Sequence, residues 1–537
     1  MERPQYNAGN GTTANGSNES RAGIDYDLLP YLSMPVAYTQ PAHLAARAAL
    51  FGLSSPTADR ARVLELGCAA GGNLIPLAAR FPQAHFLGID LSTRQIADGR
   101  NRIAAFGLTN IELRQGDIAA LTLPANSFDY VICHGVFSWV PPLTQDAIFR
   151  IINNCLVDNG VATISYNVLP GWHLRSPVRD ILLHHAGVDG TPQARVALAR
   201  DMLRQIETAT SGRHAYGSVL RDEAKRMRLM PASYILGEFL AENNAPATFR
   251  NFTGKAERHD LCFLGEADLN AEANELITPD ARRDLERLAR TDRNEAEQRL
   301  DLFSGRPFRR SLLVKTSTAR SLSAPKPERL TGLYLTSRLV PDPARTKDRT
   351  IAFVDGRGRS IATQTPCVGR ALMQLATAYP ATAPVDTLTG AGPDSTRIAK
   401  VLLRLLSEGR ASVSTLPLAA GGATEVRPRA WVLARAEAAM GQPFVTSMRH
   451  VAVELPRIAA GVTARLDGTN DRNALAQWLA RALAAGTVHL PDQEAPLPGG
   501  EALVAVARSH VEETLRHLAV GAVLLPPSAR TESHSAT

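Results

Sequence analysis

A short apolar run, a glycine-rich turn and a second apolar run that ends in a carboxylate constrain this chain more than any other feature. Val63–Leu66 predicts a buried strand, Gly67–Gly72 a turn with little side chain, and Leu74–Arg80 the start of a helix. Glycines let the backbone pass close to a ligand, and a helix N-terminus presents free N–H groups to the ligand's polar end. Asp90 ends the next apolar run, where an acidic residue meets ribose hydroxyls in doubly wound folds. The pattern predicts a cofactor-binding α/β enzyme.

Strand-like runs alternate with helical patterns from Ala61 to about Asn167. Parallel strands joined by right-handed helical crossovers form a doubly wound, Rossmann-like sheet, and ligands bind outside the carboxyl ends of its strands. The expected strands are Val63–Leu66, His85–Ile89, Ile111–Arg114, Tyr130–Cys133 and Val161–Tyr166. The residues expected at the carboxyl ends are Gly67, Asp90, Asp117 and Cys133–His134.

The strand signal disappears from about Leu174 to Lys255, where long helical stretches predict an inserted helical subdomain. Two strand-like segments follow, Leu261–Leu264 and Arg310–Val314. We expect these two segments to complete the sheet as its last strands, which leaves the inserted helices as a lid over the active edge. The first domain is therefore expected to cover residues 24–316.

Residues 317–329 have the composition of a linker, and a second, mixed α/β domain is expected over residues 330–525. A helix, helix, strand pattern between residues 369 and 415 suits a winged helix, but the basic face that DNA recognition needs is not evident. We therefore expect this domain to serve interaction, substrate binding or scaffolding. Residues 1–23 and 526–537 predict disordered tails.

The composition is that of a globular protein of more than one domain. The chain has 537 residues, of which 45% are hydrophobic and 21% charged. A net charge of +7 without a Lys/Arg-rich block gives a nucleic-acid groove little support and leaves an acidic protein partner open. The five cysteines have no CxxC spacing, so we expect reduced thiols and no metal site. Without an apolar segment of membrane length or a signal peptide, a cytoplasmic protein is expected.

Three carboxylates distinguish this pattern from that of a nicotinamide-dependent dehydrogenase. The turn is GxAxG, formed by Gly67, Ala69 and Gly71, and not the dinucleotide motif GxGxxG. An acidic residue before the turn, Glu65, and the carboxylates at Asp90 and Asp117 have the layout of S-adenosylmethionine (SAM) methyltransferases. A dehydrogenase would leave the third carboxylate unexplained.

Three long segments closely resemble class I SAM methyltransferases that carry a methyltransferase regulatory domain. They are Val63–Asn73, Phe128–Pro141 and Ser165–Trp172. The segment Ala232–Ala267 looks like the regulatory domain itself, so the resemblance covers about Tyr26 to Lys315. A weaker similarity to the C-terminal portion of some members lies at Leu466–Arg472. The chain departs from the usual turn at its central glycine, which is Ala69 here.

The resemblance implies SAM as the cofactor and methyl transfer to a nucleophile. Members include bacterial protein-lysine methyltransferases, so it makes a protein lysine the leading acceptor. A small acceptor, such as a sugar or a secondary metabolite, is the nearest alternative. A non-catalytic SAM-binding sensor or scaffold is the alternative of another class.

The candidate site residues fall into two groups. Those expected to bind the cofactor are Tyr38, Glu65, Gly67, Cys68, Ala69, Gly71, Asn73, Asp90, Leu91, Gly116, Asp117 and His134. Those expected to form the acceptor pocket or act in catalysis are His134, Trp139, Tyr166 and Trp172. Packing in the core is an equal alternative for the last three. His134 suits a hydrogen-bonded pocket residue better than a general base, and Cys68 and Cys133 also suit small buried side chains.

Overall fold

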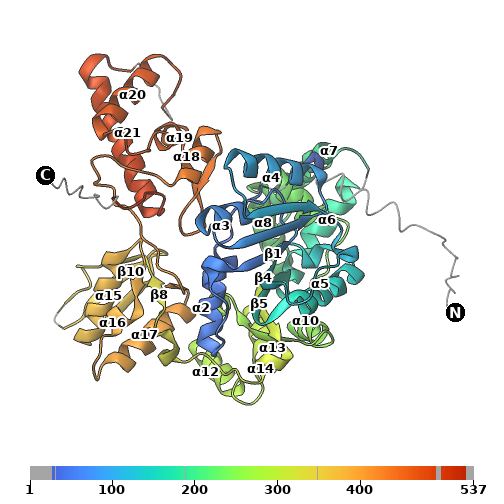
Figure 1. Ribbon diagram of the computed structural model, residues 1–537. Coiled ribbons are helices and arrows are strands. Elements are labelled where there is room, and N and C mark those ends of the chain that lie inside the picture. The colour runs from blue at the N-terminus through green and yellow to red at the C-terminus, as the bar shows by residue number, and fades with distance from the viewer. Residues whose placement is uncertain (1–26, 31, 188, 348, 491–496, 528–537) are drawn as a thin grey trace, which may run out of the picture.

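The computed structural model describes residues 27–527 except 31, 188, 348 and 491–496, so the expected tail at 1–23 and residues 528–537 lie outside the described part. A seven-stranded sheet in the order β3-β2-β1-β4-β5-β7-β6 dominates the fold (Figure 1). Its strands are β1 (Arg62–Leu66), β2 (His85–Asp90), β3 (Ile111–Gln115), β4 (Phe128–Cys133), β5 (Leu156–Asn167), β6 (Leu261–Glu266) and β7 (Phe308–Lys315). Strands β1 to β5 are parallel, and β7 runs antiparallel to β5 and β6. The doubly wound sheet and its two late strands are therefore confirmed.

Helices cover both faces of the sheet, because alternate residues of each buried strand point to opposite faces. Val63 belongs to a core shared with α2 (Pro41–Phe51), α3 (Leu74–Arg80) and α4 (Thr93–Ala105). Leu64 belongs to a second core on the other face, with α5 (Pro142–Cys155) and α10 (Phe249–Glu257). Both faces of the central strands are thus dry, and the carboxyl edge is left for the site.

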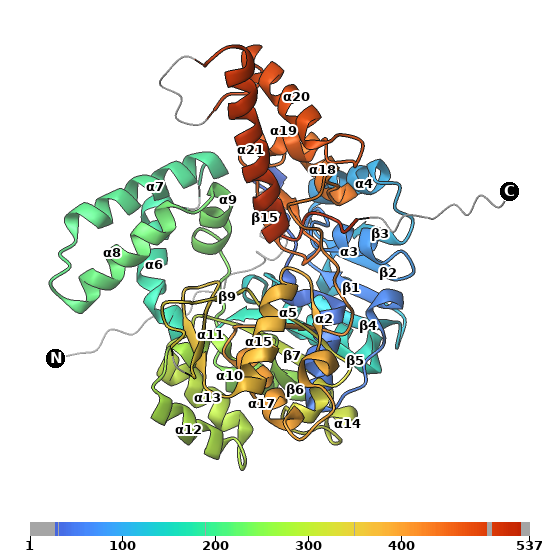
Figure 2. The ribbon, with the colours of Figure 1, turned by 90° about the vertical axis from the view of Figure 1, so that its left-hand side faces the viewer.

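The insert between β5 and β6 has two parts. Four helices and a π-helical turn form a lobe with its own apolar core, and Figure 2 shows this lobe projecting from the sheet. The lobe consists of α6 (Ser176–Ala186), α7 (Pro192–Ala209), α8 (Ala215–Arg228), α9 (Ala232–Tyr234) and the turn Ile235–Phe239. Helix α10 is different, since its Phe249 and Phe252 are fully buried in the core of the sheet. The part of the insert that is separate from the sheet therefore ends near Leu240.

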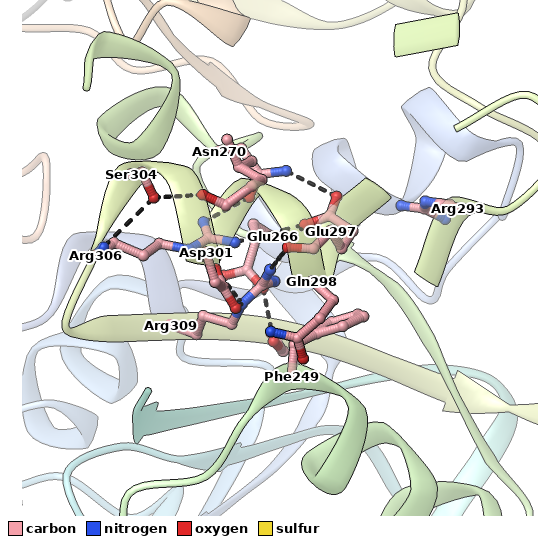
Figure 3. Close-up of polar contacts among 12 residues, drawn as sticks. Phe249, Glu266, Asn270, Arg293, Glu297, Gln298, Asp301, Ser304, Arg306 and Arg309 are labelled. Atoms are coloured by element: carbon pink, nitrogen blue, oxygen red, sulfur yellow. Dashed lines mark hydrogen bonds and ion pairs between the residues drawn. The ribbon is translucent and has the colours of Figure 1, made fainter. Parts of the chain in front are cut away.

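A buried ionic cluster fixes the helices after β6 to the sheet (Figure 3). Arg309 of β7 is fully buried and bonds Glu266 Oε1 at 2.7 Å, Asp301 Oδ2 at 2.9 Å and Glu297 Oε2 at 3.0 Å. Asp301 and Glu297 lie on α13 (Arg293–Ser304), and Arg306 also pairs with Asp301 at Oδ1. Buried charges are tolerated only when they are paired and hydrogen-bonded in this way, and removal of one partner is strongly destabilising. Helices α11 (Ala271–Glu275) and α12 (Pro279–Leu288) complete this segment.

The chain after β7 contains two further hydrophobic cores. The first contains β8 (Tyr334–Thr336), α15 (Pro366–Ala378), α17 (Ser395–Ser407) and β13 (Ser412–Ser414), and packs on Leu50 of α2. The remaining elements of this unit are β9 (Leu339–Pro341), β10 (Ile351–Asp355), β11 (Ser360–Thr363), β12 (Ala383–Pro384) and α16 (Val385–Thr389).

The second core packs on Ile75 of α3 and lies beside the first on the same side of the sheet (Figure 1). Its elements are α18 (Val432–Ala439), β14 (Phe444–Thr446), β15 (Ala452–Glu454), α19 (Arg457–Thr463), α20 (Arg472–Ala484) and α21 (Gly500–Val520). The segment predicted as a linker contains α14 (Thr316–Ala319) and the 3-10 turn Pro327–Leu330. It contacts α2, because Arg329 donates to the carbonyl of Leu50 at 2.9 Å.

Candidate functional site: a cofactor turn at the carboxyl edge of the sheet

The turn after β1 is built on left-handed backbone. The φ angles are +78° at Gly67, +49° at Ala69 and +71° at Gly71. An alanine in left-handed backbone costs about 1 kcal/mol of conformational free energy. At Ala69 this conformation is held by a hydrogen bond, because its N–H donates to Asp90 Oδ2 at 2.7 Å. The N–H groups of Gly67 and Cys68 both donate to the carbonyl of Ile89, at 2.8 and 3.1 Å. The alanine that replaces the usual glycine is thus held by the carboxylate at the end of β2.

Asp90 and Asp117 lie at the same edge, since Asp90 is the last residue of β2 and Asp117 follows β3. Asp90 is partly exposed and also accepts from the N–H of Ser92 at 2.9 Å, while burial raises its pKa. Asp117 is exposed and accepts from the N–H of Ala119 at 2.8 Å. Leu91, next to Asp90, exposes 41% of its surface, and the N–H of Gly116 donates to the carbonyl of Asp90. Two carboxylates and an exposed apolar side chain therefore face solvent together.

Glu65 is buried beneath the turn with one oxygen unpaired. Its Oε1 accepts from Asn73 Nδ2 at 2.8 Å, and its Oε2 has no hydrogen-bond partner among the described residues. Burial raises the pKa of Glu65 to about 8, and the Asp90 carboxylate adds to this shift. Cys68 and Cys133 are buried small side chains, and all five cysteines are unpaired. A cationic ligand group beside Glu65 would complete this arrangement.

The segment before α2 crosses over the turn. The N–H of Gly72 donates to Ser33 Oγ at 2.7 Å, and the N–H of Val36 donates to Asn73 Oδ1 at 3.0 Å. A Cβ on Gly72 would lie 2.2 Å from the carbonyl oxygen of Ser33, so this close approach requires glycine. The segment therefore shields the start of α3 from solvent.

His134, after β4, is held by two hydroxyl groups. Its Nδ1 lies 2.6 Å from the Tyr38 hydroxyl and 2.9 Å from Ser165 Oγ, which also accepts from the N–H of Gly135. Burial and, to a lesser extent, the charge of Arg310 together lower the pKa of His134 to about 4. Burial also raises the pKa of Tyr38 above its usual range. Both side chains are therefore neutral at pH 7, and His134 is a fixed hydrogen-bonded residue.

The three aromatic residues expected near His134 lie mostly in packed regions. Tyr166 is fully buried and stacks on Phe252 with ring centroids 3.9 Å apart. Trp172 is also fully buried and meets Trp139 edge to face at 6.0 Å. Trp139 alone of the three is partly exposed. Tyr166 and Trp172 thus pack in the core, which was the alternative to a place in the acceptor pocket. Neither side chain has an exposed surface for an acceptor to contact.

Several residues at this edge were not identified as site residues from the sequence pattern. Ser165 is a polar residue at the end of a buried strand, a position that strand alternation alone could have identified. Arg310 lies over the ring of Tyr38 at 5.1 Å. His450 comes from the last core, and its Nε2 lies 2.7 Å from Asn73 Oδ1. No local signal marks His450, because its partner is 377 residues away in the chain.

SAM fits the donors and acceptors of this edge. The unpaired Glu65 Oε2 suits an ammonium group, Asp90 keeps acceptor capacity for ribose hydroxyls, and Leu91 beside Asp117 suits an adenine ring. The described residues contain no group of three or more His, Cys, Asp or Glu side chains placed to hold a metal ion. The strand order and the turn at its carboxyl edge define a class I SAM-dependent methyltransferase.

Comparisons with known proteins agree with this class. The family described as "Methyltransferase domain" matches residues 63–160, and "Predicted methyltransferase regulatory domain" matches residues 231–315. An uncharacterized protein of Rickettsia prowazekii is 35% identical over 242 residues, which are 45% of this chain and 97% of that protein. Another from the same organism is 38% identical over 300 residues, 56% of this chain and 54% of that protein, so the chain spans about half of its length.

A solved structure covers nearly the whole chain. PKMT2 from Rickettsia typhi in complex with AdoHcy is 25% identical, with a TM-score of 0.80 over 92% of this chain and 100% of that one. The chain belongs to the class I SAM-dependent methyltransferases that carry the methyltransferase regulatory domain.

One family match differs in position from the sequence pattern. The family described as "PKMT, C-terminal winged helix domain" matches residues 427–523, which form the second of the two late cores. The sequence pattern instead pointed to residues 369–415, in the first of them. Both cores contain an amphipathic helix of 13 residues, α17 in the first and α20 in the second, so periodicity alone does not distinguish them. In the part of the chain that the structure describes, no helix is long and apolar enough to cross a membrane.

Proposed function

We propose that this protein transfers methyl groups from SAM to lysine side chains of proteins. The observation that carries the proposal is the joint position of the turn, Asp90 and the neutral His134 at one sheet edge. The likeness to PKMT2 and the match to a PKMT winged helix domain support a protein lysine as the acceptor, because PKMT denotes a protein lysine methyltransferase. Tyr166 and Trp172 then support the acceptor region by packing, and the partly exposed Trp139 borders it.

Residues of the turn and its edge would hold the cofactor. Gly67, Cys68, Ala69 and Gly71 offer close backbone approach, while Glu65, Asn73, Asp90, Leu91, Gly116, Asp117, Tyr38 and His134 surround it. Bound SAM supplies an electrophilic methyl group on its sulfonium, so no enzyme residue has to form a covalent bond. The chain's task is to align the nucleophile and exclude water, and positioning contributes on the order of 7–11 kcal/mol.

A lysine acceptor must lose a proton before it can attack. Its ammonium has a pKa of about 10.4 in water, and transfer into an apolar site disfavours the charged form. Tyr38 and His134 are neutral, and the rings of Tyr38, His134 and Phe308 pack edge to face. Their shared environment would lower the amine's pKa, and the Tyr38 and Ser165 hydroxyls hold the imidazole in one orientation.

The test is transfer of a tritiated methyl group from SAM to a bacterial lysate. We expect label in the protein fraction that survives base treatment and is recovered as methyllysine after hydrolysis. Asp90→Ala should abolish the label, because it removes the acceptor for the Ala69 N–H and a charged partner of the cofactor. The matched control is Asp59→Ala, which changes a carboxylate before β1 that has no part in the turn. Label in small molecules alone would favour a small acceptor, and saturable SAM binding without product would favour a sensor.

A further inference from the structure

A cavity of about 520 Å³ lies between the catalytic sheet and the two late cores. We call it the interdomain cavity. Four parts of the chain line it: the start of α2, the segment after β6, the first late core at Tyr334–Arg338 and Arg410–Ser414, and the second at Met448–Val451. Tyr38 also lines the cavity, and its hydroxyl bonds His134 at 2.6 Å. The cavity therefore adjoins the site at which we propose methyl transfer.

The lining of the interdomain cavity is strongly basic. It includes eight arginines but only three carboxylates, Asp268, Glu272 and Asp355. The carboxylates are already engaged: Asp355 pairs with Arg359 at 2.7 Å, and the other two pair with Arg310 at 3.2 to 3.5 Å. A surplus of cationic groups around a cleft attracts anions, since the low-dielectric walls strengthen the field.

Among these arginines, Arg449, Arg80 and Arg47 have no carboxylate within ion-pair distance among the described residues. Arg449 donates to the Tyr379 hydroxyl at 2.6 Å, and Arg80 donates to the carbonyl of Met448 at 2.7 Å. The third, Arg47 of α2, is 3% exposed, and its Nη1 has no hydrogen-bond partner in the described part of the chain. Its Nε makes a long contact of 3.4 Å with His43 Nε2.

Arg47 is the observation that points to a ligand. A buried guanidinium without a direct ion pair is costly: burial, only partly offset by the charge of Asp268, lowers the pKa of Arg47 to about 10. A second buried polar atom that lines the same cavity, Thr336 Oγ1, also has no partner among the described residues. Two unsatisfied donors from different parts of the chain thus border one volume that is rich in arginine. Guanidinium groups match carboxylates geometrically and bind them by paired hydrogen bonds.

We propose that the interdomain cavity binds aspartate or glutamate side chains of the polypeptide that carries the acceptor lysine. This inference rests on the proposed function. The acceptor chain enters between the late cores and the sheet, its carboxylates bind Arg47 and Arg449, and its lysine reaches the edge at His134. The enzyme then selects lysines that have acidic neighbours and does not require a fixed sequence. The reason is that a charged pocket discriminates ligands by their charge more than by the shape of their side chains.

The test compares two synthetic peptides that differ only in the residues around one lysine. One carries Asp and Glu, and the other carries Asn and Gln at the same positions. We expect a kcat/KM at least tenfold higher for the acidic peptide, mainly through KM, and a preference that declines with added salt. Arg47→Met should remove this preference and leave turnover of the neutral peptide unchanged. If Arg47→Met does not fold, Arg449→Met at another wall of the cavity replaces it in the test and should also reduce the preference. Arg283→Met on the exposed helix α12 is the control.

Binding of the acidic peptide, labelled with fluorescein, is followed by anisotropy and does not depend on turnover. Competition by the unlabelled acidic peptide but not by the neutral one is expected. Methyllysine at equal rates on both peptides would contradict the cavity proposal and leave the proposed function intact. Absence of methyllysine on both would contradict the proposed function, and equal binding of both peptides would then contradict the cavity proposal as well. Inorganic phosphate could protect Arg47 against an arginine-specific reagent while the acidic peptide does not. That result would assign the cavity to a small anion and overturn the proposal.

Discussion

His450 of the last core forms a hydrogen bond with the side-chain amide of Asn73 at the start of α3, with Nε2 and Oδ1 2.7 Å apart. Asn73 also donates to Glu65, and its Oδ1 accepts from the N–H of Val36. Because Oδ1 is an acceptor, His450 carries its proton on Nε2. The φ of His450 is +60°, so this contact is made from strained backbone. The second late core therefore contacts the residue that orders the cofactor turn.

His450→Ala should weaken SAM binding by about fivefold without unfolding the protein. The loss of one buried hydrogen bond costs roughly 1 kcal/mol and loosens the side chain of Asn73. Isothermal titration with SAM measures the effect. His517→Ala is the matched control, because His517 is an exposed histidine of the same core. Equal affinities of the two variants would show that the last core does not contribute to the turn.

Gly67→Ala should abolish SAM binding through a steric clash. A Cβ at this position would lie 2.2 Å from Val136 Cγ2, and the backbone φ of +78° also disfavours it. Gly135→Ala separates the two causes, since Gly135 has a φ of +72° but a Cβ added there would meet no atom within 4 Å. That control should lose only about 1 kcal/mol of stability.

The double variant Gly67→Ala with Val136→Ala tests the same argument in reverse. Removal of the Val136 methyl groups leaves its Cβ at 3.5 Å from the new methyl, an ordinary contact. Partial recovery of SAM affinity is expected from titration. If the double variant binds no better than Gly67→Ala although both fold, the clash with Val136 is not the cause.

Much of the sheet was predictable from the chain because local patterns decide it. Val63 and Leu64 point to opposite buried faces, which produces the continuous apolar runs of a doubly wound sheet. Asp90 was predictable as a strand-end carboxylate for the same reason. The antiparallel direction of β7 was not, because strand direction depends on the connection through α13 and not on side-chain alternation.

Side-chain roles at the site were less predictable, because they depend on contacts that no sequence window contains. An aromatic residue near the end of a strand, such as Tyr166, is as compatible with a pocket as with the core. In the structure Tyr166 stacks on Phe252 and belongs to the core. His450 and Arg47 become informative only when the late cores pack against α2 and α3.

The free energy of unfolding should pass through a maximum near pH 7. Burial lowers the pKa of His43, His134 and His450 to about 3, 4 and 3. Below pH 6.5 the unfolded chain binds these protons and the folded chain does not, so stability falls as the pH falls. Glu65 has the opposite sign, because its pKa is raised to about 8 and stability falls as the pH rises from about 4.5 to 8.

Between pH 5 and 6 the histidines outweigh Glu65, and stability should rise by about 2 kcal/mol per pH unit. Urea unfolding as a function of pH measures this slope. His450→Gln should reduce the acid slope by about one proton, and Glu65→Gln should remove the decline above pH 7. An unchanged slope in His450→Gln would mean that His450 titrates normally in the folded protein.

Arg309→Met should destabilise the protein by about 3–5 kcal/mol, because it leaves Glu266, Asp301 and Glu297 without their shared cation in a buried region. Urea unfolding compares it with Arg283→Met, which breaks an exposed pair with Asp280 and should change stability by less than about 1 kcal/mol. Similar unfolding midpoints for the two variants would argue that water enters the cluster and compensates the carboxylates.

The helical lobe offers the sharpest separation of cofactor binding from acceptor binding. We propose that this lobe covers the acceptor, since Trp172 lies 6.0 Å from Trp139 after β4 and 6.5 Å from Phe239 of the lobe. Replacement of residues 176–240 by a short Gly/Ser bridge removes the lobe with its whole apolar core. The bridge is short, because Arg179 in the first turns of α6 donates to the carbonyl of Ala241.

The truncated protein should bind SAM with nearly unchanged affinity and lose most transfer to a protein acceptor, because the turn and Asp90 lie on the sheet and the lobe does not. Circular dichroism and SAM titration first establish that it folds. A longer deletion to residue 255 is the contrasting variant, and it should fail to fold because Phe249 and Phe252 leave the core of the sheet. Full-rate methylation by the shorter deletion would show that the lobe is not a lid, and would move acceptor binding entirely to the interdomain cavity.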